Sequence, residues 1–406
     1  MAEANLTRFG PHSIEPEAGR PDVAMTSTFR AVEGAAELSL ISDGAAAVQV
    51  RVNGHSVAVP ELHGGEEVRV PVDLLRDNTI EVSTSHAVTL RVRQVTQADL
   101  GLLRQGYFGL NTSDMEKQRQ FYELLGFVGE IYPAGPETST TFARSLGFAD
   151  DYLIYVSLHS LENPQMPPFV DTVQFRGESF RSEAPYARLN HLGMAYATYS
   201  TTDLDGAYNY LQANGVNFLS PPAQAPNGER FVFLQEQDGA FLKLIETTPA
   251  AENAEPGANL VRLVNTNMNV SDMERSREFY RLIGFSESVP AAQAGDGEFA
   301  AAHGFDSTIR FDGQDISLGE GTDGATLQLR QWQNPYDGEQ PYPPPVNHLG
   351  IDRINFYVKD LTATVKAMNE LGFEQLGPIG GSPEIGIVFF FDPDGIKVQF
   401  AGPQTA

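Results

Sequence analysis

The first part of the chain alternates apolar and polar residues with a period of two, which is typical of strands that bury one face. The alternation at residues 48–52 runs into Asn53-Gly54, and Val57 and Val59 continue it afterwards. Asn-Gly between two alternating runs is a strong hairpin signal, because both turn residues must accept a positive φ. The same alternation recurs at residues 68–72, 80–82 and 88–92. We therefore expect residues 1–98 to form a small antiparallel β-sandwich.

The rest of the chain repeats itself. TSDMEKQRQFYELLGF at residues 112–127 matches VSDMERSREFYRLIGF at residues 270–285. NHLG at residues 190–193 recurs at residues 347–350. Internal similarity at a nearly constant spacing indicates a duplication.

The duplication divides the chain into two halves, residues 99–248 and residues 259–406, which an acidic, proline-bearing linker joins. Each half contains two units with the order strand, helix and several strands. In the first unit Ser113 and Glu116 have capping-box spacing, and Gly126 is expected to end the helix. The second unit of each half closes with a hairpin, which we expect to turn at Asp238-Gly239 and at Asp392-Pro393-Asp394-Gly395.

Composition narrows the classes of function. The 406 residues include 27 Lys and Arg against 53 Asp and Glu, which gives a formal net charge of −26. A nucleic-acid or anionic-membrane partner requires the opposite balance. The absence of cysteine excludes disulfides, thiolate metal ligands and a cysteine nucleophile. Since no transmembrane segment or secretory signal is recognisable, we expect a cytoplasmic protein.

Two stretches carry a resemblance to a known superfamily. They are SDMERSREFYRLIGF at residues 271–285, and FYVKDL, LGF and FFFDPDGIKVQF within residues 356–400. Over residues 102–403 the chain resembles the vicinal oxygen chelate superfamily, which includes glyoxalases, extradiol ring-cleaving dioxygenases, fosfomycin-modifying enzymes and bleomycin-binding proteins. The resemblance implies an α+β fold in which four βαβββ modules form two paired halves, preceded here by the small all-β sandwich. Paired modules curve into a cup, so we expect two cups.

In that superfamily a divalent metal such as Fe, Mn, Zn or Ni sits in the cup, held by His on the first strands and Glu on the last strands, and acts as a Lewis acid. The first-strand positions of this chain carry Tyr107, Tyr196, Asn265 and Arg353. The last-strand positions carry Lys243 and Gln399, and alignment on a shared Asn-Pro adds Ser157 and Gln328. None of these residues is His or Glu, and a Lys or Arg places a cation where the metal would lie.

A second register offers a partial metal site. NHLG resembles the start of the strand that supplies a metal-binding His in biphenyl-diol-cleaving dioxygenases. This resemblance implies that His191 is a metal ligand, with Glu246 as a second ligand and His159 nearby in the sequence. The second half offers His348 without a matching carboxylate. The alternative is that NHLG is a loop leading into a strand.

Other candidates have both a functional and a structural interpretation. Trp332 could stack on a planar ligand in a cup or pack in the core. Arg353 could bind an anionic ligand or form an internal salt bridge, because a buried cation without a partner is costly. His303 is expected to be a solvated loop residue.

Three functions follow. The first is a metal-dependent enzyme that acts on a small oxygenated, cyclic or aromatic substrate by ring cleavage, isomerisation or lyase chemistry, with His191 and Glu246 as ligands. The second is a metal-free enzyme in which Tyr107, Tyr196 and Lys243 transfer protons. The third is a non-catalytic protein that sequesters an aromatic or antibiotic-like ligand, and such a scaffold is also compatible with a homodimer. The residues expected to contact a small ligand are Asn265, Gln328, Arg353, Gln399 and Trp332.

Overall fold

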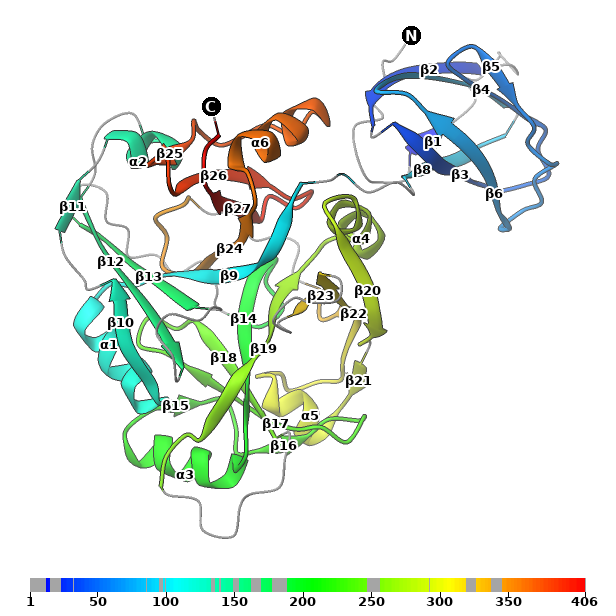
Figure 1. Ribbon diagram of the computed structural model, residues 1–406. Helices are drawn as coiled ribbons and strands as arrows, with labels where there is room; N and C mark the ends of the chain where they lie inside the picture. The colour runs from blue at the N-terminus through cyan, green and yellow to red at the C-terminus, as the bar shows by residue number, and fades with distance from the viewer. Residues whose placement is uncertain are drawn as a thin grey trace. The chain divides into compact units, whose positions relative to one another are not determined.

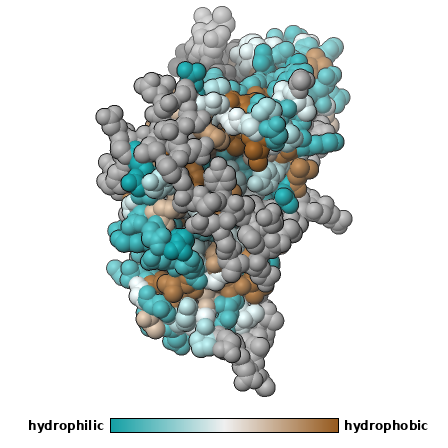
Figure 2. Space-filling view, turned by 60° about the vertical axis from the view of Figure 1, so that its left-hand side comes forward, coloured by the Kyte–Doolittle hydropathy of each residue, from teal (hydrophilic) through white to brown (hydrophobic). Residues whose placement is uncertain are grey.

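The computed structural model describes residues 12–14, 23–31, 33–84, 86–94, 98, 100–132, 136–138, 140–148, 153–161, 169–176, 188–246, 256–291, 293–318, 326–336 and 345–405. The chain divides into two compact units. One unit contains residues 1–100 with residues 274–285 and 363–374, and the other contains residues 101–273, 286–362 and 375–406. Figure 2 shows a mostly hydrophilic face with small, separated hydrophobic areas, in keeping with the net charge of −26.

The N-terminal region forms two four-stranded antiparallel sheets, in the orders β1-β8-β3-β6 and β2-β7-β4-β5. One hydrophobic core, with Leu38, Val50 and Ile80 among its members, takes side chains from both sheets, so the predicted sandwich is confirmed. The hairpin is confirmed too, because Asn53 and Gly54 both have positive φ. The strands are β1 (His12–Ile14), β2 (Val23–Arg30), β3 (Gly34–Ser42), β4 (Val48–Val52), β5 (His55–Val57), β6 (Glu67–Leu74), β7 (Asp77–Thr84) and β8 (Val88–Gln94).

The remaining chain contains four successive segments, each with a strand, a helix and further strands (Figure 1). The first holds β9 (Leu102–Asn111), α1 (Met115–Leu124), β10 (Phe127–Tyr132), β11 (Pro136–Thr138), α2 (Thr140–Ser145), β12 (Leu153–Leu161) and β13 (Phe169–Arg176). The second holds β14 (Gly193–Thr201), α3 (Leu204–Ala213), β15 (Asn217–Phe218), β16 (Ala223–Gln224), β17 (Arg230–Gln235) and β18 (Phe241–Glu246). The third holds β19 (Leu260–Asn269), α4 (Met273–Leu282), β20 (Phe285–Pro290), β21 (Gln293–Gly295), α5 (Gly297–Ala302), β22 (Ile309–Leu318) and β23 (Thr326–Asn334). The fourth holds β24 (Gly350–Val358), α6 (Leu361–Glu370), β25 (Gly380–Gly381), β26 (Gly386–Phe391) and β27 (Lys397–Gly402).

These strands form two large sheets that interleave the predicted halves. The nine-stranded sheet joins the first segment to the fourth through the antiparallel pair β9–β24, which lie side by side in Figure 1 although about 250 residues separate them. The ten-stranded sheet joins the second segment to the third through β14–β19. Modules are therefore paired across the two halves and not within each half. Sequence similarity records which segments share ancestry, but it does not determine which first strands pair.

The closing hairpins connect the two segments within each predicted half. Asp238, in the β17–β18 turn, accepts hydrogen bonds from Thr112 Oγ1 at 2.7 Å, from Ser113 N at 2.8 Å and from Ser113 Oγ at 2.5 Å. Asp394, in the β26–β27 turn, accepts the equivalent bonds from the backbone and hydroxyl of Ser271. Ser113 therefore does not cap α1 as its spacing predicted. Asp114 is the N-cap, and its side chain accepts from Glu116 N and Lys117 N.

We predict that Asp238→Ala lowers the free energy of unfolding by about 2–4 kcal/mol, because three hydrogen bonds to a carboxylate are lost together. Urea unfolding of the full chain measures this. The matched control is Asp205→Ala, whose exposed carboxylate pairs with Arg230, and we expect it to change stability by less than about 1 kcal/mol. Equal effects of the two substitutions would show that the hairpin does not hold the first helix.

Candidate functional site

The residues at the superfamily's ligand positions gather into two groups, one on each large sheet. Tyr107 and Arg353 lie on β9 and β24 of the nine-stranded sheet, and Gln399 lies on the neighbouring strand β27. Tyr196, Lys243, Asn265 and Gln328 lie on four adjacent strands of the ten-stranded sheet, β14, β18, β19 and β23.

Strand register identifies the remaining position of the nine-stranded group as Asp171 and not Ser157. Asp171 on β13 is opposite Gly109 of β9, just as Gln328 is opposite Asn267 in the third segment. Ser157 lies one strand further away, on β12. The alignment on Asn-Pro was wrong because the dipeptide precedes the last strand in the first segment and ends it in the third.

In the nine-stranded group Arg353 forms an internal salt bridge. Its Nη2 donates to Asp171 Oδ2 and its Nη1 to Asp352 Oδ1, each at 2.5 Å, and the side chain is buried. Burial lowers the pKa of Arg353, but the two carboxylates raise it on balance, so the guanidinium stays charged. A Cβ on Gly109 would overlap this guanidinium, so glycine gives Arg353 its space. Of the two interpretations of Arg353, the structure shows the internal ion pair.

Tyr107 and Gln399 belong to the same buried group. Burial, followed by the charge of Asp171, raises the pKa of the Tyr107 hydroxyl, whereas Arg353 lowers it. Tyr107 is therefore a proton donor at neutral pH. Gln399 is buried, and its Oε1 has no hydrogen-bond partner.

The ten-stranded group contains a lysine that is already paired. Lys243 Nζ lies 2.5 Å from Glu229 Oε1 and 4.9 Å from the centroid of the Phe231 ring. Burial lowers the pKa of Lys243, and Glu229 opposes this shift. Because its pKa is lowered, the amine of Lys243 becomes neutral at a lower pH than an exposed lysine does.

A chain of hydrogen bonds crosses the same group. Tyr196 OH donates to Gln328 Oε1 at 3.3 Å, and Gln328 Nε2 donates to Asp315 Oδ1 at 2.9 Å. Burial raises the pKa of Tyr196, so the phenol keeps its proton. Asn265 is buried beside them, and its Oδ1 has no hydrogen-bond partner.

Arg330 on β23 is the functional candidate that the sequence analysis missed. It is only 1% exposed, and its Nε and Nη1 have no hydrogen-bond partner among the residues that the structure describes. Its Cζ lies 4.2 Å from the ring centroid of Phe311 and 5.3 Å from that of Tyr196. The signal was strand alternation, because residue 330 lies between Gln328 and Trp332 at a spacing of two. Burying guanidinium N–H groups without a hydrogen-bond acceptor is costly, so these two donors make Arg330 a candidate for binding an anion.

His191 and Glu246 are not brought together. His191 precedes Gly193, the first residue of the nine-residue strand β14, whereas Glu246 is paired with Thr201 at the other end. At about 3.3 Å per residue these ends lie roughly 26 Å apart. Glu246 instead accepts from Arg230 Nη1 at 3.0 Å.

Both NHLG motifs lead into strands and are held through their backbone. The carbonyl of His191 accepts from Asn269 Nδ2, and the carbonyl of His348 accepts from Asn111 Nδ2, each at 2.6 Å. His159 lies elsewhere, on β12, where its ring stacks on Tyr122. Burial lowers the pKa of His159 to about 4, with a smaller contribution from the charge of Arg119.

The donor sets do not fit a divalent metal. Within the described ranges no three His, Asp or Glu side chains converge on one point. The ligand positions of the nine-stranded sheet hold Arg353 and its ion pair, and those of the ten-stranded sheet hold Lys243. A cation at the metal position repels the metal. We therefore derive no step through a metal ion.

Trp332 and His303 belong to the hydrophobic core beside Arg330. Trp332 is buried, its ring packs against Phe311, and its Nε1 donates to Asn269 Oδ1 at 3.1 Å. His303 is buried among aromatic rings, with its Nδ1 2.8 Å from the carbonyl oxygen of Phe299. The expectation of a solvated His303 was wrong, because helix α5 places the residue against the sheet and not in a free loop.

We predict opposite effects of one substitution at the two buried arginines. Arg353→Met leaves Asp171 and Asp352 buried without their cation, so the free energy of unfolding should fall by about 3–5 kcal/mol. Arg330→Met removes a buried cation whose Nε and Nη1 have no acceptor, so stability should be unchanged or higher. Urea unfolding of both variants measures the contrast. Equal losses would mean that Arg330 is neutralised as fully as Arg353.

Comparison with known proteins supports the resemblance seen in the sequence. Residues 104–244 match the family model described as the Glyoxalase/Bleomycin resistance protein/Dioxygenase superfamily. Glyoxalase I from Zea mays is similar in structure, with 16% sequence identity, a TM-score of 0.50, and an alignment that covers 74% of this chain and 92% of that chain. A putative dioxygenase from Bacillus subtilis subsp. subtilis str. 168 shares 12% identity, with a TM-score of 0.48 and coverage of 74% of this chain and 85% of that chain. No curated protein sequence matches the chain.

At such low identity the similarity to glyoxalase I concerns the fold. None of the helices that the structure describes is long and apolar enough to cross a membrane. The strand-rich α+β fold and the family match lead to one conclusion: the chain has the vicinal oxygen chelate fold, and its residues 104–244 belong to the glyoxalase/bleomycin resistance protein/dioxygenase superfamily.

Proposed function

We propose that the protein binds a small organic acid, without a metal, on the ten-stranded sheet at Arg330. The observation that carries this proposal is the buried guanidinium whose Nε and Nη1 have no hydrogen-bond partner. A carboxylate is the ligand group that best matches a guanidinium in charge and geometry. The proposal makes this chain a metal-independent relative of the superfamily's small-molecule proteins.

The neighbouring groups support a carboxylate in preference to a neutral ligand. Lys243 is paired with Glu229, and Asp315 accepts from Gln328, whereas Nε and Nη1 of Arg330 have no hydrogen-bond acceptor among the described residues. The Tyr196 hydroxyl keeps its proton, and it can donate to a ligand in exchange for its long 3.3 Å bond to Gln328 Oε1. The rings of Phe311 and Tyr196 flank the guanidinium and favour an acid with a planar, apolar body.

We expect benzoate to bind and to change the fluorescence of Trp332, the single tryptophan of the chain, which packs against Phe311. Arg330→Met should weaken benzoate binding by about tenfold or more, which is the loss of one charge-assisted interaction. Arg330→Lys should give an intermediate affinity, because it keeps the charge without the planar fork. Benzyl alcohol, the matched neutral probe, should bind weakly to all three proteins. If Arg330→Met binds benzoate as wild type does, Arg330 is not the anion site.

Lys243 supports a second candidate function, metal-independent proton transfer. Its buried amine has a lowered pKa and lies in the group that contains Tyr196 and Arg330. A bound acid with an acidic C–H would then lose its proton to Lys243, while Tyr196 donates a hydrogen bond to the developing oxyanion.

We predict that the protein accelerates deuterium exchange at the methylene group of phenylpyruvate, measured by NMR in D₂O. The neutral amine of Lys243 forms above its folded-state pKa, so the rate should rise with pH and level off below the pH expected for an exposed lysine. Lys243→Met should abolish the enzyme-dependent rate but leave benzoate binding. A rate that is unchanged in Lys243→Met would leave ligand binding as the only function proposed for this sheet.

A further inference from the structure

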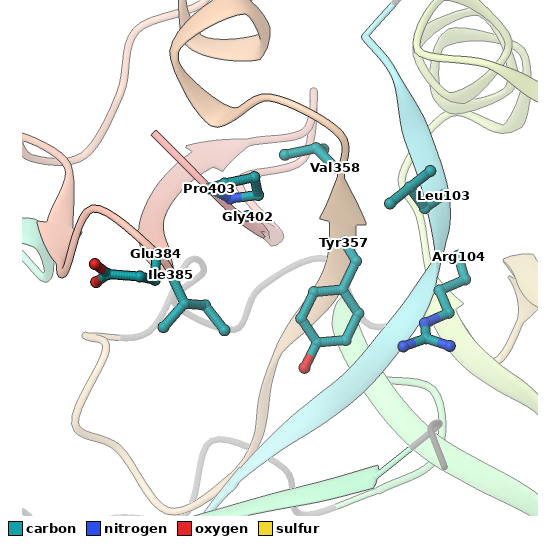
Figure 3. A pocket seen from close by; sticks show the side chains of 8 residues that line it. All are labelled: Leu103, Arg104, Tyr357, Val358, Glu384, Ile385, Gly402 and Pro403. Carbon is teal, nitrogen blue, oxygen red and sulfur yellow. The ribbon is translucent and has the colours of Figure 1, made fainter. Parts of the chain in front are cut away.

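We propose a second small-molecule site on the nine-stranded sheet, in a pocket that suits an aromatic acid. The pocket has a volume of about 490 Å³. Its lining residues are Leu103, Arg104, Tyr357, Val358, Glu384, Ile385, Gly402 and Pro403 (Figure 3). This volume is within the usual range for sites that enclose small organic ligands.

Four separate parts of the chain build the pocket. The first strand β9 contributes Leu103 and Arg104, and its antiparallel neighbour β24 contributes Tyr357 and Val358. The end of β27 and the turn before β26 complete the lining. None of the residues at the superfamily's metal-ligand positions lines this pocket, so it is distinct from both groups of buried side chains described above.

Apolar side chains face each other across the pocket and remain exposed. Figure 3 shows Leu103 on one side and Ile385 on the other, with Tyr357 between them. Leu103 is 52% exposed and Ile385 is 53% exposed, although both are large aliphatic residues. Pro403 also lines the pocket, whereas Val358 is buried. Exposed apolar side chains that converge on a concavity are typical of a ligand site and not of scattered surface residues.

The polar side chains that line the pocket determine which polar group a ligand with an apolar body can carry. The Cζ of Arg104 lies 5.4 Å from the ring centroid of Tyr357, so a cation and an aromatic face lie together on one side. Glu384 lies on the opposite side, next to Ile385, and its carboxylate points away from Tyr357. A planar ring can pack against Tyr357 and the aliphatic walls, with its acidic group toward Arg104.

The Tyr357 hydroxyl remains a donor in this setting. Burial raises its pKa, Arg104 lowers it and the charge of Asp171 raises it, and the net direction is upward. A protonated phenol can donate to an acidic ligand without charge repulsion. The pocket therefore offers two donors, Arg104 and Tyr357, on the side opposite Ile385.

The test uses 8-anilinonaphthalene-1-sulfonate, an aromatic sulfonate with an N–H group, titrated into the full chain and followed by its fluorescence. Ile385→Glu places a second carboxylate in the pocket, and we expect it to weaken binding by about tenfold or more. Arg104→Gln removes the cation and should weaken binding by a similar factor. The matched control is Val261→Glu, because Val261 is a 45% exposed aliphatic residue that does not line the pocket. We expect it to bind the probe as wild type does.

Two further comparisons separate this site from the one at Arg330 and from loss of folding. Arg330→Met should leave unchanged the part of probe binding that Ile385→Glu removes if the pocket is the site, and thermal unfolding should show that each variant is folded. The proposal is overturned if Ile385→Glu and Arg104→Gln, both folded, bind the probe like wild type. It is also overturned if Arg330→Met alone abolishes binding, because the probe would then occupy the ten-stranded sheet.

Discussion

Each of the two large sheets buries an arginine, and how that charge is neutralised governs what the sheet can do. On the nine-stranded sheet Asp171 and Asp352 hold Arg353 at 2.5 Å, so the charges balance within the protein. On the ten-stranded sheet Arg330 is more deeply buried, and its Nε and Nη1 have no acceptor. A buried charge is costly unless it is paired, which is why we propose that the second sheet binds an anion at these two donors.

The same cations explain why the expected metal-ligand positions of this fold do not suit a metal ion here. The fold brings the expected ligand positions together on each sheet, as the superfamily's architecture requires. The residues at those positions, however, include Arg353 and Lys243, and their charges replace that of the metal. A scaffold can thus keep the positions of a site while its side chains make metal binding unfavourable, and we propose that anion binding takes its place here.

Much of the fold could be predicted from the sequence, because local patterns determine local structure. Alternation and Asn53-Gly54 indicated the sandwich, and the repeated motifs indicated the segments after it. The pairing of the first segment with the fourth could not be predicted, since it depends on contacts between distant strands. Dependence on contacts between distant strands also limited the prediction of the site. Tyr196 and Lys243 were predicted from motif spacing and Gln328 from the shared Asn-Pro. Asp171 required the strand register, and Arg330 required knowledge of which buried donors lack partners.

The most direct test of the account is the metal content of the full chain, purified without an affinity tag and measured by elemental mass spectrometry. Each large sheet carries a cation at the expected metal-ligand positions, and no three His or carboxylate ligands converge in the described residues. We therefore expect metal far below one equivalent per chain. About one equivalent of Fe, Mn, Zn or Ni per chain would contradict the account, because a bound metal could not share these positions with Arg353 or Lys243.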